Sequence, residues 1–275
     1  MTINCRGKLI DLSSPKVMGI LNITPDSFHD GGQFFSPDHA LHHAQKMLAE
    51  GADFIDVGGM SSRPGAQIIS ADEELNRVLP VVQKILKHHP EAIISVDTLR
   101  AKVALAVLET GAHIINDISA GRYDDGMIMT VARYKAPFII MHMQGMPADM
   151  QKAPAYLDVV NEVYDFFVER ISACGKAGII DTILDPGYGF GKTLEHNYAL
   201  LRNQSYFTNL RQPVLAGLSR KSMICQALHV NPDKALNGTT AANMLALTNG
   251  ANILRVHDVK EANECIGIWE MFNKT

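Results

Sequence analysis

The feature that most constrains the fold is the regular return of short apolar segments along the chain. Eight such segments, each five to eight residues long, are rich in β-branched side chains and apolar on both faces. This pattern is typical of parallel strands that are buried on both sides. The segments are residues 16–21, 53–58, 92–97, 113–117, 137–143, 182–187, 213–219 and 251–258.

Stretches with helical character separate these segments. Residues 36–52 begin with a Ser at the predicted N-cap, followed by a Pro in the first turn, and residues 70–89 open with the capping-box pattern of Ser70 and Glu73. Strand and helix thus alternate roughly eight times, which predicts an α/β fold, a (β/α)8 TIM barrel forming a single domain over residues 1–275. An open doubly wound sheet is the alternative, because periodicity does not distinguish the two folds.

Composition excludes several classes of protein. The chain is 47% hydrophobic and 20% charged, as globular domains are, and no apolar stretch approaches the roughly 20 residues that span a membrane. The first residues have no sustained apolar region, so we expect no signal peptide. The four cysteines are scattered singly, which favours a reducing, cytoplasmic location. A net charge of -4 without basic runs argues against a nucleic acid partner.

Polar side chains end nearly every apolar segment. In a barrel the carboxyl ends of all strands meet at one face, where the binding site is built. A single such residue is as readily a helix cap or a turn residue, but a whole ring of them predicts a site. The residues in this position are Asn22, Asp56, Asp97, Asn116, Asp117, His142, Asp185, Ser219, Arg220, Lys221, Arg255 and His257.

Part of this ring has the chemistry of an anion site. The guanidinium groups of Arg63 and Arg255, together with His257 and the hydroxyls of Ser61 and Ser62, suit a phosphate-type anion.

The rest of the ring suits other groups. Asp97, Asn116 and Asp185 offer acceptors and an amide for a polar heterocycle that presents N–H donors. Lys221 fits either half of the site. Asn22 offers a hard oxygen for Mg²⁺ that is otherwise held by substrate phosphates.

Two motifs are weak evidence for a nucleotide site or a metal site. The segment "GYGFGKT" at 187–193 resembles a nucleotide P-loop, but the required spacing places Pro186 where the first Gly should stand. Its glycines more plausibly let the backbone and Phe190 approach a ligand. Histidines 39, 42 and 43 share a helix on the predicted barrel exterior, and histidines 88 and 89 lie near a helix end, so both groups are interpreted as surface residues.

Seven motifs follow one another in the order and spacing of a known family. They are "NITPDSFHDGG", "DVGGMSSRPGA", "SVDT", "INDISA", "DPGYGFGK", "GLSRKS" and "RVHDV", and they span essentially the whole chain. In these motifs the chain resembles dihydropteroate synthase, the enzyme of folate biosynthesis that sulfonamides inhibit. The "TPDSF" loop is the specific part, because related pterin-binding barrels lack it.

The resemblance implies a homodimeric barrel that condenses 6-hydroxymethyl-7,8-dihydropterin pyrophosphate with 4-aminobenzoate. It implies that Asp97, Asp185, Lys221 and Arg255 are catalytic and that Asn22 binds Mg²⁺. The residues implied for the pterin are Asp97, Asn116, Asp185 and Lys221; for pyrophosphate Ser62, Arg63, Arg255 and His257; and for aminobenzoate Phe28, Pro64, Phe190, Lys221 and Ser222.

The chain departs from the family pattern at two positions. Met60 stands where many members have an acidic residue, and Ser62 replaces a common Thr but keeps its hydroxyl. Residues 22–32 resemble a lid that closes over the site and carries Phe28, and residues 60–68 resemble a second substrate-dependent loop.

Two other functions stay open from the sequence. One is a pterin-binding methyltransferase that serves a corrinoid protein, and the other is a non-catalytic pterin-binding protein. The methyltransferase has no need for Asn22 with Arg63 and Arg255 around a diphosphate, and the binding protein would not need the closing loops.

Overall fold

Eight parallel strands form the centre of the molecule. The structure, a computed structural model, describes residues 1–24, 36–61, 65–66, 69–147 and 149–274. The strands pair in the order β8-β7-β6-β5-β4-β3-β10-β9, and every neighbouring pair is parallel. Their bounds are β3 Lys16–Asn22, β4 Phe54–Gly58, β5 Ile93–Asp97, β6 Ile114–Asp117, β7 Phe138–Met141, β8 Thr182–Asp185, β9 Leu215–Ala216 and β10 Ile253–Val256.

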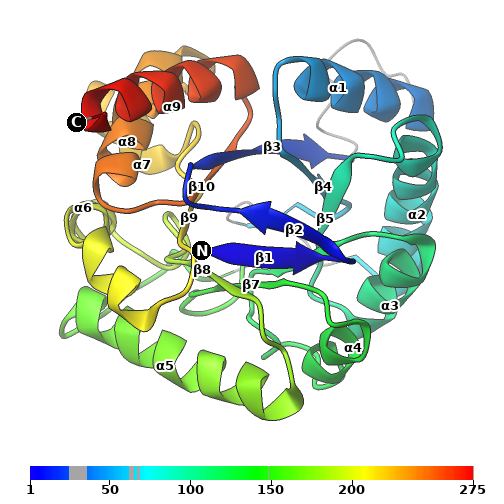
Figure 1. The fold of residues 1–275 in the computed structure, drawn as a ribbon. Coiled ribbons are helices and arrows are strands. Elements are labelled where there is room, and N and C mark those ends of the chain that lie inside the picture. The colour runs from blue at the N-terminus through cyan, green and yellow to red at the C-terminus, as the bar shows by residue number, and fades with distance from the viewer. Residues whose placement is uncertain (25–35, 62–64, 67–68, 148, 275) are drawn as a thin grey trace.

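The two ends of this strand order meet. A parallel bridge joins Leu184 in β8 to Val214, directly before β9, and Leu184 N donates to Pro213 O over 2.8 Å. The sheet therefore closes on itself, and Figure 1 looks along the resulting barrel. All eight predicted strand segments are confirmed, and the closed barrel replaces the open sheet as the fold.

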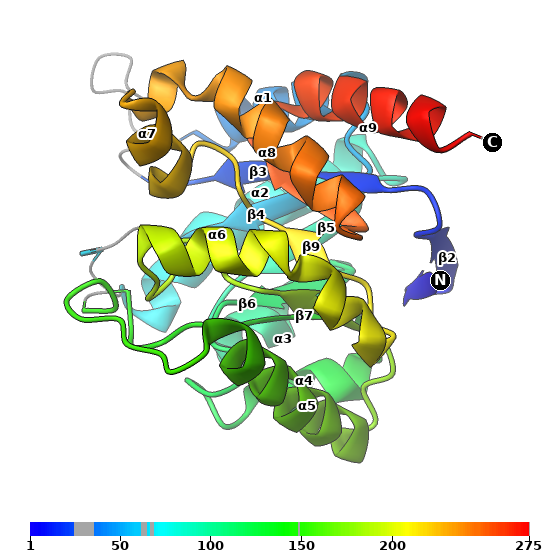
Figure 2. The same cartoon turned by 90° about the vertical axis from the view of Figure 1, so that its left-hand side faces the viewer.

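Helices surround the barrel on its outside (Figures 1 and 2). They are α1 Pro37–Ala49, α2 Ala71–His88, α3 Ala101–Thr110, α4 Met127–Tyr134, α5 Val159–Ala177, α6 Leu194–Arg202, α7 Ser222–Leu228, α8 Leu236–Thr248 and α9 Val259–Asn273, with short 3-10 turns at Gln204–Leu210 and Pro232–Lys234. Ser36 and Ser70 cap α1 and α2 as predicted, with the Ser70 hydroxyl accepting from Glu73 N. None of the helices in the described part of the chain is long and apolar enough to cross a membrane.

Each strand alternates between the inside and the outside of the barrel. One apolar cluster contains Met18, Phe54, Ile93, Ile114, Ile139, Ile183, Leu215 and Ile253, one residue from each of the eight strands, at the inside. The intervening residues, such as Val17, Ile55 and Ile115, belong to a larger cluster that also holds the buried faces of the helices. Counting in steps of two from the inner layer therefore shows which strand-end residues point into the barrel.

A hairpin that the sequence did not predict closes the amino-terminal end of the barrel. Strands β1 (Thr2–Cys5) and β2 (Lys8–Asp11) pair antiparallel, and Figure 2 shows the hairpin at the end where the barrel strands begin. Ile3, Cys5 and Leu12 are at most 1% exposed and pack against the inner layer. With this end filled by side chains, the opposite end is the open mouth.

Candidate active site

The inward-pointing residues at the carboxyl ends of the strands bring several predicted residues together. Asp56, Asp97, Asn116, Asp185 and Arg255 each lie two or four positions beyond the inner apolar layer of their own strand. Asp97 on β5 and Arg255 on β10 are joined by a hydrogen bond of 3.1 Å, although 158 residues separate them. The expectation that these two residues share one end of the barrel is confirmed.

Arg255 lies between two carboxylates. Its Nε donates to Asp56 Oδ2 at 2.7 Å and a terminal nitrogen donates to Asp97 Oδ2 at 3.1 Å. Asp56 is fully buried, and the side chains of Asp97 and Arg255 are 12% and 17% exposed. Burial raises the pKa of the Asp97 carboxyl, the Arg255 guanidinium lowers it, and the nearby Asp56 carboxylate raises it. Charge-assisted pairs in such a site are stronger than those in water, and they fix the direction of both partners.

Two buried oxygens beside this pair find no hydrogen-bond partner among the residues that the structure describes. Asn116 donates from Nδ2 to Asp56 Oδ2 at 3.0 Å, which leaves Asn116 Oδ1 and Asp56 Oδ1 buried without a hydrogen bond. Buried acceptors are normally satisfied, so these two atoms call for donors from a ligand or water. Asp56 was noted as a strand-end residue but given no role; the structure shows that it positions both Arg255 and Asn116.

A second charged pair lies on the other side of the mouth. Asp185 at the end of β8 accepts from Gly187 N at 2.8 Å, and burial raises its pKa while the Lys221 ammonium lowers it. Burial in turn lowers the pKa of Lys221 to about 8. A Cβ placed on Gly217 would lie 3.7 Å from Lys221 Nζ and 3.9 Å from Asp185 Oδ2, so the missing side chain leaves space next to both charges.

Lys221 also contacts the loop that follows β8. Its ammonium donates to Tyr188 O and lies 4.8 Å from the centroid of the Phe190 ring. Ser222, the first residue of α7, is exposed beside it. The structure therefore places Phe190, Lys221 and Ser222 next to one another, and their predicted role in binding aminobenzoate stays a prediction.

Apolar side chains form one wall of the mouth. Met60, Leu99, Ile118 and Met141 are buried in a small cluster, and Phe190 packs against it. Met60, at a position that is often acidic in the family, is 9% exposed and so belongs to this wall. An acidic side chain here would lose its hydration without gaining a partner in the described cluster.

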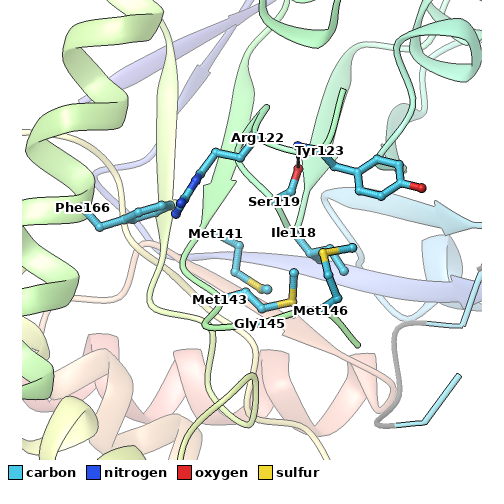
Figure 3. Close-up of a pocket in the computed structure, with 9 residues that line it drawn as sticks. All are labelled: Ile118, Ser119, Arg122, Tyr123, Met141, Met143, Gly145, Met146 and Phe166. Atoms are coloured by element: carbon cyan, nitrogen blue, oxygen red, sulfur yellow. Dashed lines mark hydrogen bonds between the residues drawn. The ribbon is translucent and has the colours of Figure 1, made fainter. Parts of the chain in front are cut away.

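A cavity of about 380 Å³ adjoins this wall (Figure 3). Ile118, Met141, Met143 and Met146 line it, and Arg122 lies across from them over the ring of Phe166, with 5.8 Å from its guanidinium carbon to the ring centroid. The cavity thus continues the apolar side of the site outward between β6 and α5.

The donor set near Asn22 fits a magnesium ion. A Cβ on Gly58 would lie 3.4 Å from Asn22 Oδ1 and 3.9 Å from Asp97 Oδ2, so an amide oxygen and a carboxylate oxygen flank the same small space. Mg²⁺ prefers hard oxygen ligands and is commonly bound through one or two protein groups plus substrate phosphates. Among the described residues, no group of three or more His, Cys, Asp or Glu could hold a metal.

His257 lies at the rim of the mouth. It is exposed, and its Nδ1 lies 3.0 Å from Ser219 Oγ, which also accepts from His257 N at 3.2 Å. This contact ties the end of β10 to the loop after β9 and leaves the imidazole accessible at the predicted anion side.

Three strand-end residues have structural roles instead. Asp117 points outward and accepts from Ser119 N, Ser119 Oγ and Gly121 N, each at 2.7 Å, so it caps a turn. Arg220 forms a bidentate ion pair with Asp258, at 2.9 and 2.6 Å, which connects the loop after β9 to the residues after β10. His142 lies outside the inner layer, buried against Lys192.

The "GYGFGKT" glycines also differ from their predicted role. A Cβ on Gly187 would lie 2.0 Å from His142 O, and one on Gly191 would lie 2.3 Å from Gln144 O. Both glycines have positive φ and approach backbone, so they permit the packing of two loops rather than the approach of a ligand. Lys192 donates to backbone carbonyls of the protein, so its ammonium does not point to a phosphate site. This agrees with the interpretation that the segment is no P-loop.

The remaining predicted residues lie outside the described part of the chain. These are Phe28, Ser62, Arg63 and Pro64, together with most of the predicted loops at 22–32 and 60–68. Their roles stay predictions. Of the histidines in α1, His39 and His42 are exposed and His43 is half-buried, as expected for a helix on the barrel exterior.

Fold and site together define a barrel enzyme that acts on a small polar heterocycle. The pterin binding enzyme family matches residues 18–257 of the chain. Dihydropteroate synthase of Escherichia coli (strain K12) is 48% identical over 272 residues, which cover 98% of this chain and 96% of that protein.

Solved structures give the same result. The Yersinia pestis dihydropteroate synthase in a complex with a sulfonamide drug superimposes with a TM-score of 0.95 at 45% identity, covering 100% of both chains. The Xanthomonas albilineans dihydropteroate synthase with 4-aminobenzoic acid gives a TM-score of 0.93 at 41% identity, covering 100% of this chain and 98% of that one. The chain belongs to the pterin binding enzyme family and, within it, to the dihydropteroate synthases.

Proposed function

We propose that this chain catalyses the dihydropteroate synthase reaction of folate biosynthesis. In this reaction the methylene carbon of 6-hydroxymethyl-7,8-dihydropterin pyrophosphate forms a C–N bond to the amine of 4-aminobenzoate. Its C–O bond to pyrophosphate breaks, and the amine loses one proton. The observation that carries the proposal is the buried polar ring at the mouth, in which Asp56 Oδ1 and Asn116 Oδ1 have no hydrogen-bond partner among the described residues, in a chain with full-length relatives of this activity.

The pterin occupies the buried side of the ring. Its ring N–H and amino groups donate to Asn116 Oδ1 and to the Asp185 carboxylate, and the Lys221 ammonium donates to a ring acceptor. Asp97 faces the same space, held there by Arg255. Gly217 leaves room for the flat heterocycle next to Lys221 and Asp185.

Pyrophosphate lies nearer the rim, on Arg255 in β10 and on His257 directly after it, and the roles predicted for Ser62 and Arg63 belong to the same ligand. Asn22 would hold Mg²⁺ at this point, together with oxygens of the diphosphate. When bound, the ion neutralises charge that builds up on the leaving group. The Arg255 guanidinium, with N–H groups not used by Asp56 and Asp97, contributes in the same sense.

Aminobenzoate lies over Phe190, between Lys221 and Ser222, with Phe28 and Pro64 completing its site. The carboxylate of the aminobenzoate lies at the exposed side of these residues, where the Ser222 hydroxyl can donate to it. The aryl amine is neutral at physiological pH, so positioning and electrostatics carry the rate enhancement without a strong base. The carboxylates of Asp97 and Asp185 stabilise the positive charge that develops on the pterin as pyrophosphate departs.

A coupled assay for pyrophosphate release tests this function. Release should require both pterin pyrophosphate and 4-aminobenzoate, together with Mg²⁺. Release that does not depend on 4-aminobenzoate would contradict the proposal.

Thermal-shift measurements separate the two rival functions. Stabilisation by pterin pyrophosphate with Mg²⁺ supports the synthase, stabilisation by a methylated folate supports a methyltransferase, and stabilisation by pterin alone supports a binding protein. Inhibition by sulfonamides, which resemble 4-aminobenzoate, is a further expectation of the synthase.

We also propose a homodimer that forms through α9. Ile268, Met271 and Phe272 are 65%, 64% and 81% exposed and share one face of this helix by their spacing, and Leu245 on the neighbouring α8 is 52% exposed. Grouped exposed apolar side chains of this size commonly mark an interface. Light scattering should give twice the chain mass, and Ile268→Glu should give the monomer; a monomeric parent protein would exclude the dimer.

The four cysteines support a cytoplasmic location. All of them are free, and Cys5, Cys174 and Cys265 are buried. Burial raises the pKa of the Cys5 thiol to about 12, so it is an unreactive thiol.

A further inference from the structure

Lys192 is a buried lysine with a complete set of acceptors. It follows the "GYGFG" segment and is only 3% exposed. Its Nζ lies 3.0 Å from His142 Nδ1, 3.2 Å from His142 O, 2.9 Å from Gly187 O and 3.0 Å from Phe190 O. Within the described residues, no carboxylate pairs with it directly.

Such a group is costly to bury. An ammonium loses its hydration, and here only dipoles replace it. Burial lowers the pKa of Lys192 to about 7, Asp185 raises it and Lys221 lowers it further. A methionine or leucine would fill the same volume without this cost, so the ammonium has a use beyond filling space.

The positions of the acceptors of Lys192 show what the ammonium does. Gly187 O and Phe190 O belong to the two ends of the turn after β8, which Phe190 N closes by donating to Gly187 O at 3.1 Å. His142 directly follows β7, which ends at Met141. The Lys192 ammonium therefore connects both ends of the 187–190 turn to His142, next to β7.

The whole turn is held in this way. Its carbonyls at 187, 188, 189, 190 and 191 accept in order from Lys192, Lys221, Gln151, Lys192 and Tyr156. Lys192 supplies two of these five bonds. The same turn carries the Phe190 ring that lies against Lys221, so a shift of the turn moves both groups.

We propose that Lys192 is a positioning residue, whose contacts with these four acceptors hold the 187–190 turn against the end of β7 and so place Phe190 and Lys221 for 4-aminobenzoate. The inference rests on the proposed function only in naming the ligand. Lys192 itself touches no substrate; it acts through the turn.

A kinetic comparison of Lys192→Met with the parent protein tests the role. Methionine keeps the length and volume but removes the charge and the donors. KM for 4-aminobenzoate should rise roughly tenfold, because a displaced turn weakens the contacts of Phe190 and Lys221 with this substrate, and KM for the pterin substrate should change less. Lys234→Met, at an exposed lysine, is the matched control and should change neither. Equal changes in both KM values, or none, would overturn the proposal.

A double-mutant cycle tests whether Lys192 acts through Phe190. If it does, the fold loss of kcat/KM in the double variant of Lys192→Met and Phe190→Ala should be smaller than the product of the two single losses, by at least about twofold. Additive effects would show that the two residues act independently, and the proposal would then fail.

Hydrogen exchange gives a readout that needs no activity. In Lys192→Met the amides of 187–191 should exchange faster, while those of β5 and β6 keep their rates. Unchanged exchange in the turn would contradict the inference even if the proposed function is wrong. Should Lys192→Met fail to fold, Lys192→Gln, which keeps two N–H donors, serves for the same three measurements.

Discussion

Arg255 and Asp185 represent the two halves of the site at the scale of single residues. Arg255 is shared by Asp56 and Asp97, whereas Asp185 is held by Gly187 N. We expect Arg255→Ala to weaken pyrophosphate binding and to lower kcat by roughly one to two decades, about 1.5–3 kcal/mol. It should also lower the melting temperature, because it leaves the fully buried Asp56 carboxylate without its cation.

Asp185→Asn should have a different effect. It keeps the shape but replaces an acceptor of pterin N–H groups by a donor, so pterin binding should weaken while pyrophosphate binding is nearly unchanged. Calorimetry with pterin alone and with pyrophosphate alone distinguishes the variants. The assignment is inverted if Asp185→Asn abolishes pyrophosphate binding and Arg255→Ala leaves it intact.

Lys221 should give the reaction an alkaline limit. Burial lowers its pKa to about 8, with Asp185 and Asp97 opposing this and Arg255 adding to it. Below pH 8 the ammonium is charged, so it donates to the pterin and attracts the aminobenzoate carboxylate; above pH 8 it becomes neutral and both interactions weaken. kcat/KM for 4-aminobenzoate should therefore fall as pH rises from 7 to 9. In Lys221→Arg, which stays charged, this decline should be absent, and an unchanged decline would assign it to another group.

Met60 should tolerate apolar replacements only. Met60→Glu would place a carboxyl in the cluster of Leu99, Ile118 and Met141, which raises its folded pKa above the unfolded value. The variant should then lose about 1–3 kcal/mol of stability, little near pH 4, increasingly as pH rises from the unfolded to the folded pKa, and by a constant amount above it. Thermal melts at several pH values measure this, with Met60→Leu as the control. A pH-independent loss would mean that the carboxyl reaches water.

The difference between Asn116 and Asp117 shows what the sequence could have decided. Both end the same apolar segment, and both were assigned to the ring. Steps of two along β6 place Ile114 and Asn116 inside, and Ile115 and Asp117 outside. Strand parity was therefore available, but it needed the inner layer as a reference, which the sequence alone does not mark when both faces are apolar.

At the scale of elements, the turn after β8 needs a glycine at 187 more strictly than at 189. Gly187 has φ +67 and its added Cβ would meet His142 O at 2.0 Å, whereas one on Gly189, φ +82, meets only the flexible Lys221 side chain at 3.4 Å. Both variants incur the strain of positive φ, about 1–2 kcal/mol. Gly187→Ala should cost several kcal/mol more, because backbone must move, and thermal melts of the two variants compare them. Equal losses would show that the loops separate easily.

The barrel strands were predictable from the sequence and the hairpin was not. Apolar segments of five to eight residues that alternate with helical stretches identify the eight barrel strands. In the hairpin, strands of four residues alternate only briefly, and the turn is made by Arg6 and Gly7, both at positive φ. An Asn-Gly pair would have signalled this turn; here Asn4 Oδ1 supports it instead by accepting from Gly7 N at 2.7 Å.

Lys192 was missed because its segment was compared with a nucleotide motif. The P-loop spacing fails at Pro186, and no local pattern shows where a lysine outside that motif places its charge. The four acceptors of Lys192 come from His142, directly after β7, and from the turn. His142 is 50 residues away in sequence, so this contact is not visible in local sequence.

At the scale of the whole molecule, the barrel separates stability from chemistry. The hairpin and the inner apolar layer fill the amino-terminal end, while the charged ring lies at the opposite end. In barrels of this kind, residues at the amino-terminal face serve stability and those at the carboxyl ends of the strands serve function. Substitutions at the hairpin should therefore change the free energy of unfolding without changing ligand affinity.

Leu12 and Leu9 provide a matched test of this separation. Leu12 is 0% exposed and packs into the inner layer, whereas Leu9, three residues earlier in β2, is 69% exposed. Leu12→Ala should cost about 2–4 kcal/mol through lost burial and the cavity that remains, and Leu9→Ala should stay within about 0.5 kcal/mol of the parent protein. Denaturant melts give both values, and pterin affinity measured at a temperature where both variants are folded should be the same in each. A loss of pterin affinity in Leu12→Ala would mean that the filled end and the open mouth are coupled through the barrel, since no hairpin residue lies near the ring.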